Sequence, residues 1–245
     1  MWWKDRVQKS FLQVEKWLTD FSHLLYPVCC AGCDRPLYLG EHLLCTSCRY
    51  HLPITDFHLD PINEGVQLLG GQFPLDFVLC YLRFEEASRV QNMVHNFKYR
   101  GGQELGFGLG KAYGELLCAV EHACLRSDIL LPIPMQVKKL KKRGYNQAEV
   151  FANGISEATK IPLRNDLLSK SPKVQTQVGK SRAARFENLE KAYEYVGEAD
   201  ELKNQSVILV DDVLTSGATI AACAQVVLEA GAKSIGVITL ARKRN

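Results

Sequence analysis

The chain has 245 residues, 47% of them hydrophobic and 23% charged, with a formal net charge of +3. These values indicate a soluble globular protein with a sizeable core, and the small net charge does not by itself point to nucleic acid. No apolar run reaches the length of about 18 residues that a transmembrane helix needs, so no stable membrane insertion is expected. Nine cysteines without a recognisable signal peptide predict a cytoplasmic protein.

The first segment, residues 1–28, is predicted to be an amphipathic helix. Apolar residues recur at steps of three and four between Trp3 and Leu25, and Pro27 ends the pattern. Docking on the protein's own core is favoured over a partner or membrane surface, and the mixed signs of the charges between the apolar positions count further against a membrane.

Two C-x-x-C pairs dominate residues 29–75, a predicted metal module and linker. Cys30 and Cys33 form the first pair, and Cys45 and Cys48 form the second. Four thiolates at this spacing can surround Zn²⁺ tetrahedrally, and the intervening residues suit a hairpin. Four cysteines leave no open coordination position, so the zinc is predicted to be structural. Cys29 can replace Cys30 by a register shift, and free cysteines or a disulfide are the alternatives to a metal.

The rest of the chain, residues 76–245, alternates between strand and helix patterns. This alternation predicts an α/β domain with a mainly parallel sheet, in which ligands bind outside the carboxyl ends of the strands. The expected strands are 77–84, 128–134, 192–197, 207–210 and 234–240, and the expected helices are 87–97, 105–124, 146–160 and 219–230.

Two basic stretches without acids stand in this domain. The first follows strand 128–134 on an expected loop, and its position favours anion binding over a merely solvated face. The second runs from Lys170 to Arg185 and is predicted to be a long loop. Together with the cation before a Gly-Gly turn, the candidate anion-binding residues are Lys98, Lys138, Lys139, Lys141, Lys142, Arg143, Arg182 and Arg185.

The most informative stretch is Val207–Thr219. Its four apolar residues predict a buried strand, and Asp211 and Asp212 follow at the strand's end. Small and hydroxyl-bearing residues then lead into a helix, whose free N–H groups suit a phosphate. Because carboxylates repel phosphate, the two acids better suit neutral hydroxyls or a metal ion. A phosphate joined to a vicinal diol is a ribose 5-phosphate. The loop residues are Thr215, Ser216, Gly217, Ala218 and Thr219.

This stretch resembles the phosphoribosyl pyrophosphate (PRPP) motif of the type I phosphoribosyltransferases at every position. The resemblance implies that Asp211 and Asp212 hold the ribose hydroxyls and are the catalytic acids. It also implies that Thr215–Thr219 holds the 5-phosphate, that Mg²⁺ accompanies PRPP, and that Lys138–Arg143 can receive pyrophosphate.

Over nearly the whole chain from about residue 22, the sequence also resembles the ComF family of competence proteins. The likeness rests on the four cysteines, Lys98–Gly101, Pro132–Pro134, Arg143–Gln147 and Val210–Asp212, in this order. It implies a zinc-bearing phosphoribosyltransferase fold that acts in DNA uptake during transformation. Single-stranded DNA and a competence helicase are the implied partners.

Several function classes stay open at this point. The chain can be a PRPP-binding module that handles single-stranded DNA, or a phosphoribosyltransferase that releases pyrophosphate while transferring ribose 5-phosphate to an unidentified amine or other acceptor. A PRPP-sensing regulator is a third class, although no DNA-reading helix is recognisable. No acceptor-activating base is evident, and Thr215 stands where purine-salvage relatives have an acid. That departure counts against a purine acceptor.

Overall fold

A computed structural model of the chain describes residues 27–86, 88–99, 102–171 and 192–243. The chain divides into two compact units between His51 and Leu52. Almost all of the predicted N-terminal helix, Arg182 and Arg185 lie outside the described residues. Within the described ranges, no helix is both long enough and apolar enough to cross a membrane.

The described part of the first unit, residues 27–51, consists of turns followed by the short helix α2 (Thr46–Tyr50). Isolated antiparallel bridges pair Cys29 with Pro36 and His42 with Leu44. The expected hairpin between the cysteine pairs is therefore reduced to turns and single bridges. Backbone hydrogen bonds at both cysteine pairs hold these turns, including Cys30 N–H to Arg35 O at 2.8 Å.

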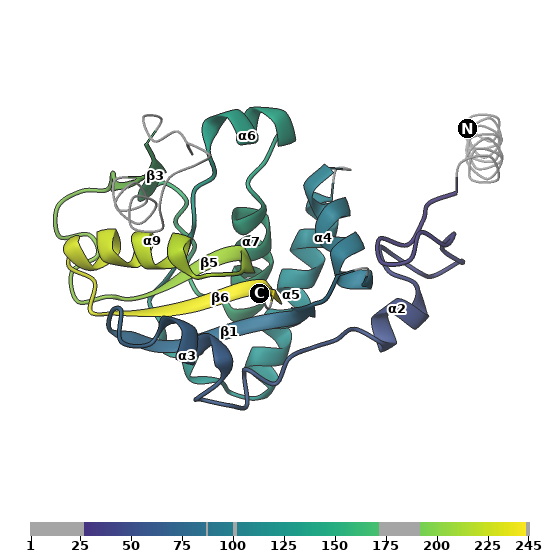
Figure 1. Cartoon of the computed structure of the whole chain (residues 1–245), viewed down its shortest axis with the longest axis horizontal. Coiled ribbons are helices and arrows are strands. Elements are labelled where there is room, and N and C mark those ends of the chain that lie inside the picture. Colours follow the sequence, from purple (N-terminus) through teal and green to yellow (C-terminus); the bar gives the residue numbers. More distant parts are fainter. Residues whose placement is uncertain (1–26, 87, 100–101, 172–191, 244–245) are drawn as a thin grey trace, which may run out of the picture. The chain divides into compact units, whose positions relative to one another are not determined.

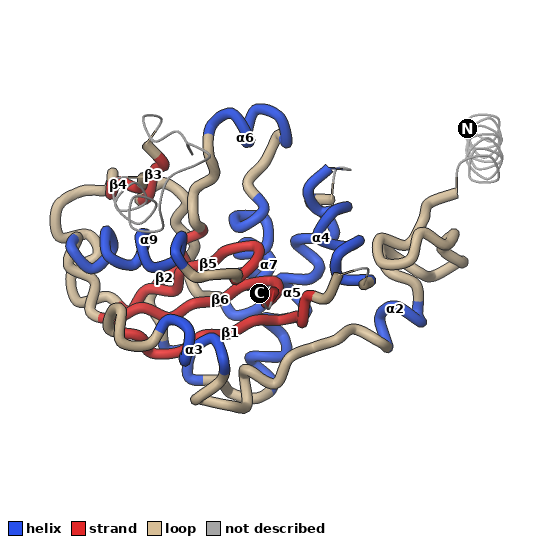
Figure 2. The backbone as a smooth tube through the Cα atoms, in the orientation of Figure 1, coloured by secondary structure: helices blue, strands red, loops and turns tan. Residues whose placement is uncertain are grey.

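The second unit is built on a four-stranded parallel sheet with the order β1-β6-β5-β2, which confirms the predicted α/β class (Figures 1 and 2). A separate antiparallel pair joins β3 to β4. The strands are β1 (Leu75–Phe84), β2 (Ile129–Pro132), β3 (Leu168–Lys170), β4 (Tyr193–Tyr195), β5 (Ser206–Leu214) and β6 (Ser234–Lys243). The helices are α3 (Glu64–Leu69), α4 (Arg89–Tyr99), α5 (Gln103–Ala119), the 3₁₀ turn η1 (Ala123–Arg126), α6 (Val137–Arg143), α7 (Gln147–Thr159) and α9 (Ala218–Glu229).

Both faces of the sheet are covered by helices. Figure 1 shows α9 in front of β5 and β6 and shows α5 and α7 behind them. Successive side chains of a strand point to opposite faces. Val207 and Leu209 accordingly pack in the core cluster that includes α9, while Ile208 and Val210 are fully buried on the other side. This double burial explains why the β5 sequence is continuously apolar before its acids.

Glycines bring α5 and α7 into close contact. A Cβ at Gly110 would lie 2.1 Å from Phe151 O, and one at Gly154 would lie 2.1 Å from Phe107 O. These glycines therefore permit the two helices to pack closely. The helix α5 ends earlier than expected, at Ala119, and η1 takes up the residues after it.

Residues 52–74, expected to be a linker attached to the cysteine module, belong instead to the second unit. The Thr55 N–H donates to Tyr81 O at 2.9 Å, and Asn63 Nδ2 donates to Val78 O at 3.0 Å. Asn63 also caps α3, a helix that the abundance of Pro, Gly and Asp obscured. The contacts with β1 thus place the division at His51 rather than near residue 75.

The basic stretch after β2 is the helix α6, not the expected loop. Lys, Leu and Arg are good helix formers, and Gly144 ends the helix in the left-handed conformation with φ of 83°. The strand β5 is also longer than expected, because pairing with β6 continues to Leu214. Asp211 and Asp212 therefore belong to the end of the strand itself.

Candidate functional site

A pocket of about 590 Å³ opens where the parallel strands end. Phe84, Asp211 and Lys243 line it from the ends of β1, β5 and β6, and Ile133 does so just after β2. This is the edge at which ligands bind in parallel α/β sheets. The helices α4 and α6 contribute further lining residues, so the pocket is assembled from elements far apart in the sequence.

The alternation along β5 sends the two acids to different sides of the pocket. The Asp212 carboxylate lies 3.1 Å from Lys98 Nζ of α4. Asp211 accepts the Asp212 N–H at 2.8 Å and lies within electrostatic reach of both Lys98 and Lys170. Burial, and then the charge of Asp212, raise the pKa of Asp211 to about 8. The pair therefore favours a ligand that brings positive charge or neutral hydroxyl donors.

The residues after β5 form a tight turn into α9. Gly217 has φ of +77°, and a Cβ there would lie 2.4 Å from Leu69 Cδ2 of α3, so both conformation and space require glycine. Thr215 and Thr219 line the pocket, whereas Ser216, Gly217 and Ala218 are not among its lining side chains. In the part of the chain that the structure describes, no side chain caps the start of α9. Its N–H groups suit an anion.

The predicted cations separate into three groups. Lys98, Lys139 and Arg143 line the pocket. In α6 this follows from helical spacing, because positions four residues apart share a face. The three other lysines of α6 are exposed and do not line the pocket, and two arginines lie outside the described residues. These five are Lys138, Lys141, Lys142, Arg182 and Arg185.

Lys170 and Tyr193 also line the pocket, although the sequence did not identify them as its residues. They are register partners in the β3–β4 pair, and Lys170 Nζ lies 2.7 Å from Tyr193 Oη. Burial lowers the pKa of Lys170 and raises that of Tyr193. The sequence indicated Lys170 only as the first residue of a basic stretch. No sequence pattern indicated that Lys170 pairs with Tyr193.

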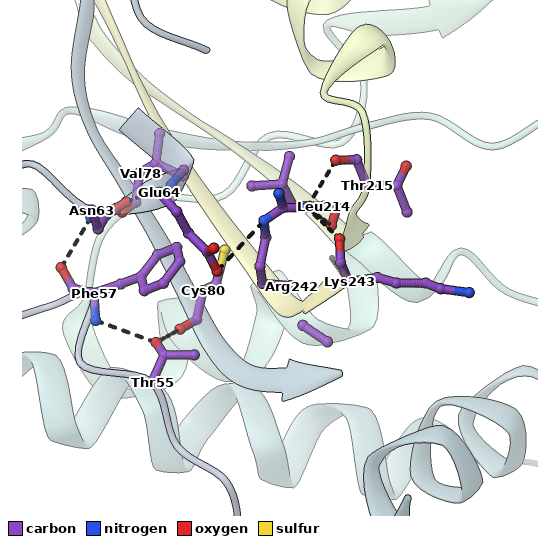
Figure 3. A network of polar contacts seen from close by, with 12 residues as sticks. Thr55, Phe57, Asn63, Glu64, Val78, Cys80, Leu214, Thr215, Arg242 and Lys243 are labelled. Atoms are coloured by element: carbon purple, nitrogen blue, oxygen red, sulfur yellow. Dashed lines mark hydrogen bonds and ion pairs between the residues drawn. The ribbon is translucent and has the colours of Figure 1, made fainter. Parts of the chain in front are cut away.

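A buried arginine supports the loop after β5 (Figure 3). Arg242 Nη1 donates to Thr215 O at 2.9 Å, to Leu214 O at 3.2 Å and to Lys243 O. Arg242 Nε also lies 3.9 Å from Glu64 Oε1 of α3. One guanidinium therefore links the start of the loop, at Leu214 and Thr215, to the end of β6. Arg242 lies beyond the expected end of β6, and no sequence pattern pointed to it.

Among the described residues, the one group of three or more side chains close enough together to hold a metal ion lies in the first unit. The Sγ atoms of Cys30, Cys33, Cys45 and Cys48 all lie within 4.8 Å of one another. Although burial opposes it, N–H groups of Cys45 and Gly32 lower the pKa of Cys30 to about 7, which favours a thiolate. The exposed Cys29 bonds to Pro27 O and is not part of the cluster. This donor set fits a tetrahedral zinc ion.

Comparisons with known proteins agree with this arrangement. The family described as phosphoribosyl transferase domain matches residues 130–245. The chain is 31% identical to Competence protein F of Haemophilus influenzae over 226 residues, covering 87% of this chain and 96% of that protein. It is 26% identical to DNA utilization protein YhgH of Escherichia coli over 236 residues, covering 89% and 99%. It is 26% identical to Competence protein ComFC of Bacillus subtilis over 218 residues, covering 87% and 77%.

Replacing one cysteine of the cluster tests the metal site. Freshly purified protein should contain zinc, and Cys45→Ser should lose it, since three thiolates bind zinc far less tightly than four. Metal binding supplies folding free energy to a module this small. Hydrogen exchange should therefore accelerate in residues 27–51 and stay unchanged from Leu52 onward. Cys29→Ser is the matched control and should retain the metal. Zinc-free fresh protein would contradict the assignment.

Replacing Arg242 tests the support of the loop. Arg242→Met leaves buried carbonyls without their donor, so the free energy of unfolding should fall by about 2 kcal/mol, as expected when charge-assisted hydrogen bonds are removed. Urea denaturation followed by circular dichroism measures this. Lys243→Met is the adjacent control, since Lys243 pairs with the exposed Glu86, and should change stability by less than about 0.5 kcal/mol. Equal effects of the two variants would exclude a special role for Arg242.

Proposed function

Because this chain belongs to the ComF family, which includes Competence protein F and ComFC, we propose that it binds PRPP and handles single-stranded DNA during DNA uptake. The names of the relatives support a role with DNA, and the match to the phosphoribosyl transferase domain supports PRPP as the ligand. One observation carries the proposal. Two carboxylates, the two threonines at the ends of the Thr215–Thr219 loop and several cations line a single pocket at the ligand-binding edge of the sheet.

The chemistry of the pocket matches the three parts of PRPP. The turn into α9 offers backbone N–H groups and hydroxyls for the 5-phosphate. Asp211 and Asp212 offer acceptors for the two ribose hydroxyls. Lys139 and Arg143 offer positive charge for the diphosphate. Mg²⁺ prefers carboxylate and phosphate oxygens, so it fits beside the acid pair together with the ligand and would neutralise the diphosphate.

The outer surface of α6 suits nucleic acid. Lys138, Lys141 and Lys142 are exposed and do not line the pocket. Phosphates of a single strand attract such cations irrespective of base sequence. The helix therefore offers one set of cations to the pocket and another to solvent, so PRPP and DNA can bind at neighbouring positions. Zinc in the cysteine cluster would then stabilise the first unit.

Catalysis of phosphoribosyl transfer is a second candidate function. The acid pair favours it, because DNA binding alone requires neither carboxylate. His95 of α4, which lines the same pocket, favours it as well. The sequence indicated no base that could activate the acceptor. The imidazole of His95 is a group of the kind that serves as a general base. Pyrophosphate release from PRPP in the presence of amine acceptors would support an enzyme, and binding without release would support the binding module.

Neutralising the acid pair tests PRPP binding. Asp211→Asn combined with Asp212→Asn should abolish Mg²⁺-dependent PRPP binding, measured by isothermal titration calorimetry. The fold should persist, because both side chains are only partly buried at the end of β5. Asp200→Asn, an exposed acid paired with Lys203, is the control and should bind normally. Unchanged affinity in the double variant would refute the proposed sugar site.

Because the pKa of Asp211 is raised, both the stability of the protein and its affinity for the ligand should depend on pH. The folded protein holds a proton that the unfolded chain has released, so stability falls as pH rises from about 4 to about 8. Asp211→Asn should remove this part of the pH dependence. The wild-type affinity for Mg²⁺ and PRPP should increase as pH rises through about 8, because the ligand requires the ionised pair.

Reversing charge on the outer surface of α6 tests DNA binding. Lys141→Glu with Lys142→Glu should weaken binding of single-stranded oligonucleotides of every sequence alike, as measured by fluorescence anisotropy. The plot of log affinity against log salt should flatten by about 0.7 for each phosphate that is no longer neutralised. The double aspartate variant should retain DNA binding, because removing acids cannot remove attraction to a polyanion. Abolished PRPP binding with unchanged DNA affinity would instead assign these lysines to the diphosphate.

A further inference from the structure

One of the two carboxylates at the sugar site is already occupied by a side chain of the protein. Lys98 Nζ lies 3.1 Å from Asp212 Oδ2, and the two side chains are 25% and 22% exposed. Lys98 stands in the last turn of α4, and Asp212 stands near the end of β5. The contact therefore forms only through tertiary packing across the pocket.

This ion pair conflicts with the role that Asp212 has in ligand binding. An ammonium at 3.1 Å uses the charge and an acceptor position of the carboxylate. A sugar diol, or a magnesium ion beside it, competes with the ammonium for the charge and the acceptor positions of this carboxylate. Ligand binding is therefore expected to weaken the contact between Lys98 and Asp212.

A displaced Lys98 has a suitable destination in the same pocket. Its flexible four-carbon stem carries three donors in any orientation, unlike the fixed fork of arginine. Lys98, Lys139 and Arg143 all line the pocket, and the last two bear the charge proposed to meet a diphosphate. Moving from one carboxylate to several phosphate oxygens replaces the broken ion pair with a new one.

We propose that Lys98 is an exchanged cation that determines specificity, pairing with Asp212 in the ligand-free protein and with the diphosphate of bound PRPP. The inference rests on the proposed PRPP function. The diphosphate of PRPP forms a new ion pair with Lys98 and so compensates for the lost contact with Asp212. Ribose 5-phosphate also breaks that contact but has no diphosphate with which Lys98 can pair. The exchange thus selects PRPP over its product-like fragment, through a contact that penalises the wrong ligand.

The test compares two ligands, ribose 5-phosphate and PRPP, each titrated with Mg²⁺ by calorimetry. Lys98→Met keeps the stem and removes the charge. It should bind ribose 5-phosphate about two- to fivefold more tightly than wild type, which corresponds to release of a partly exposed ion pair. It should bind PRPP more weakly, because the diphosphate loses a cation.

Lys243→Met is the matched control. Lys243 lines the same pocket, but its Nζ pairs with Glu86 at 3.1 Å and not with the acid pair. Loss of this charge should leave ribose 5-phosphate binding unchanged or weaker. Lys98→Arg keeps the charge and should bind ribose 5-phosphate less tightly than Lys98→Met does, which separates loss of charge from a change of fold.

The outcomes distinguish the exchange from the proposed function. Weaker ribose 5-phosphate binding by Lys98→Met would show that Lys98 is a fixed attractive charge and would overturn the exchange. Tighter binding by both Lys98→Met and Lys243→Met would overturn it too, because the effect would not depend on Asp212. A wild-type protein that binds neither ligand would overturn the proposed PRPP function itself.

Discussion

The position of β5 between β2 and β6 is the constraint on which the pocket depends. A central strand has both faces covered, so its side chains stay apolar for as long as helices cover the sheet. Full burial is interrupted after Val210, where Asp211, Asp212 and Val213 are only partly buried, and the first two of these are the acids. Because successive side chains alternate, Asp211 and Asp212 reach opposite walls of one pocket. Two adjacent residues thus place two carboxylates in one pocket. Lys98 pairs with Asp212, and burial raises the pKa of Asp211 while the charges of Lys98 and Lys170 oppose that rise.

The shape of the loop after β5 depends on elements that the phosphoribosyl motif does not contain. Arg242 comes from the neighbouring strand β6, and Glu64 and Leu69 come from α3. The guanidinium binds loop carbonyls while Leu69 packs where a side chain at Gly217 would lie. Residues 52–74 are therefore part of the architecture of the pocket and do more than join two modules. A loop that binds a phosphate, as we propose for this one, needs such support, because its N–H groups bind an anion well only when they are already oriented.

The sequence predicted the parts of this site that local patterns determine. The β5 strand, the acids and the turn glycine each have a short signal of apolar, acidic or small residues, and the separate cysteine cluster of the first unit has one in its spacing. Patterns also predicted the parallel sheet, because strands and helices alternate. Local patterns failed wherever a partner is distant in sequence. Lys170 meets Tyr193 through strand register, and Lys98 meets Asp212 through packing of α4. The helix α6 was missed because a charge run resembles a loop when its periodicity is ignored.

Several cations of the pocket form an ion pair or a hydrogen bond with another side chain of the protein, and these contacts affect which ligand binds. Lys98 pairs with Asp212, Lys170 bonds to Tyr193, and Lys243 pairs with Glu86. When an anion binds such a cation, the gain in binding free energy is only the difference between the new interaction and the internal one that it replaces. A single phosphate offers few acceptors and gains little from the exchange. A diphosphate with Mg²⁺ meets several cations at once and can replace each internal interaction with an equal or better one. A pocket whose cations are already partnered therefore discriminates by the number of phosphate groups more strongly than one lined with solvated charges.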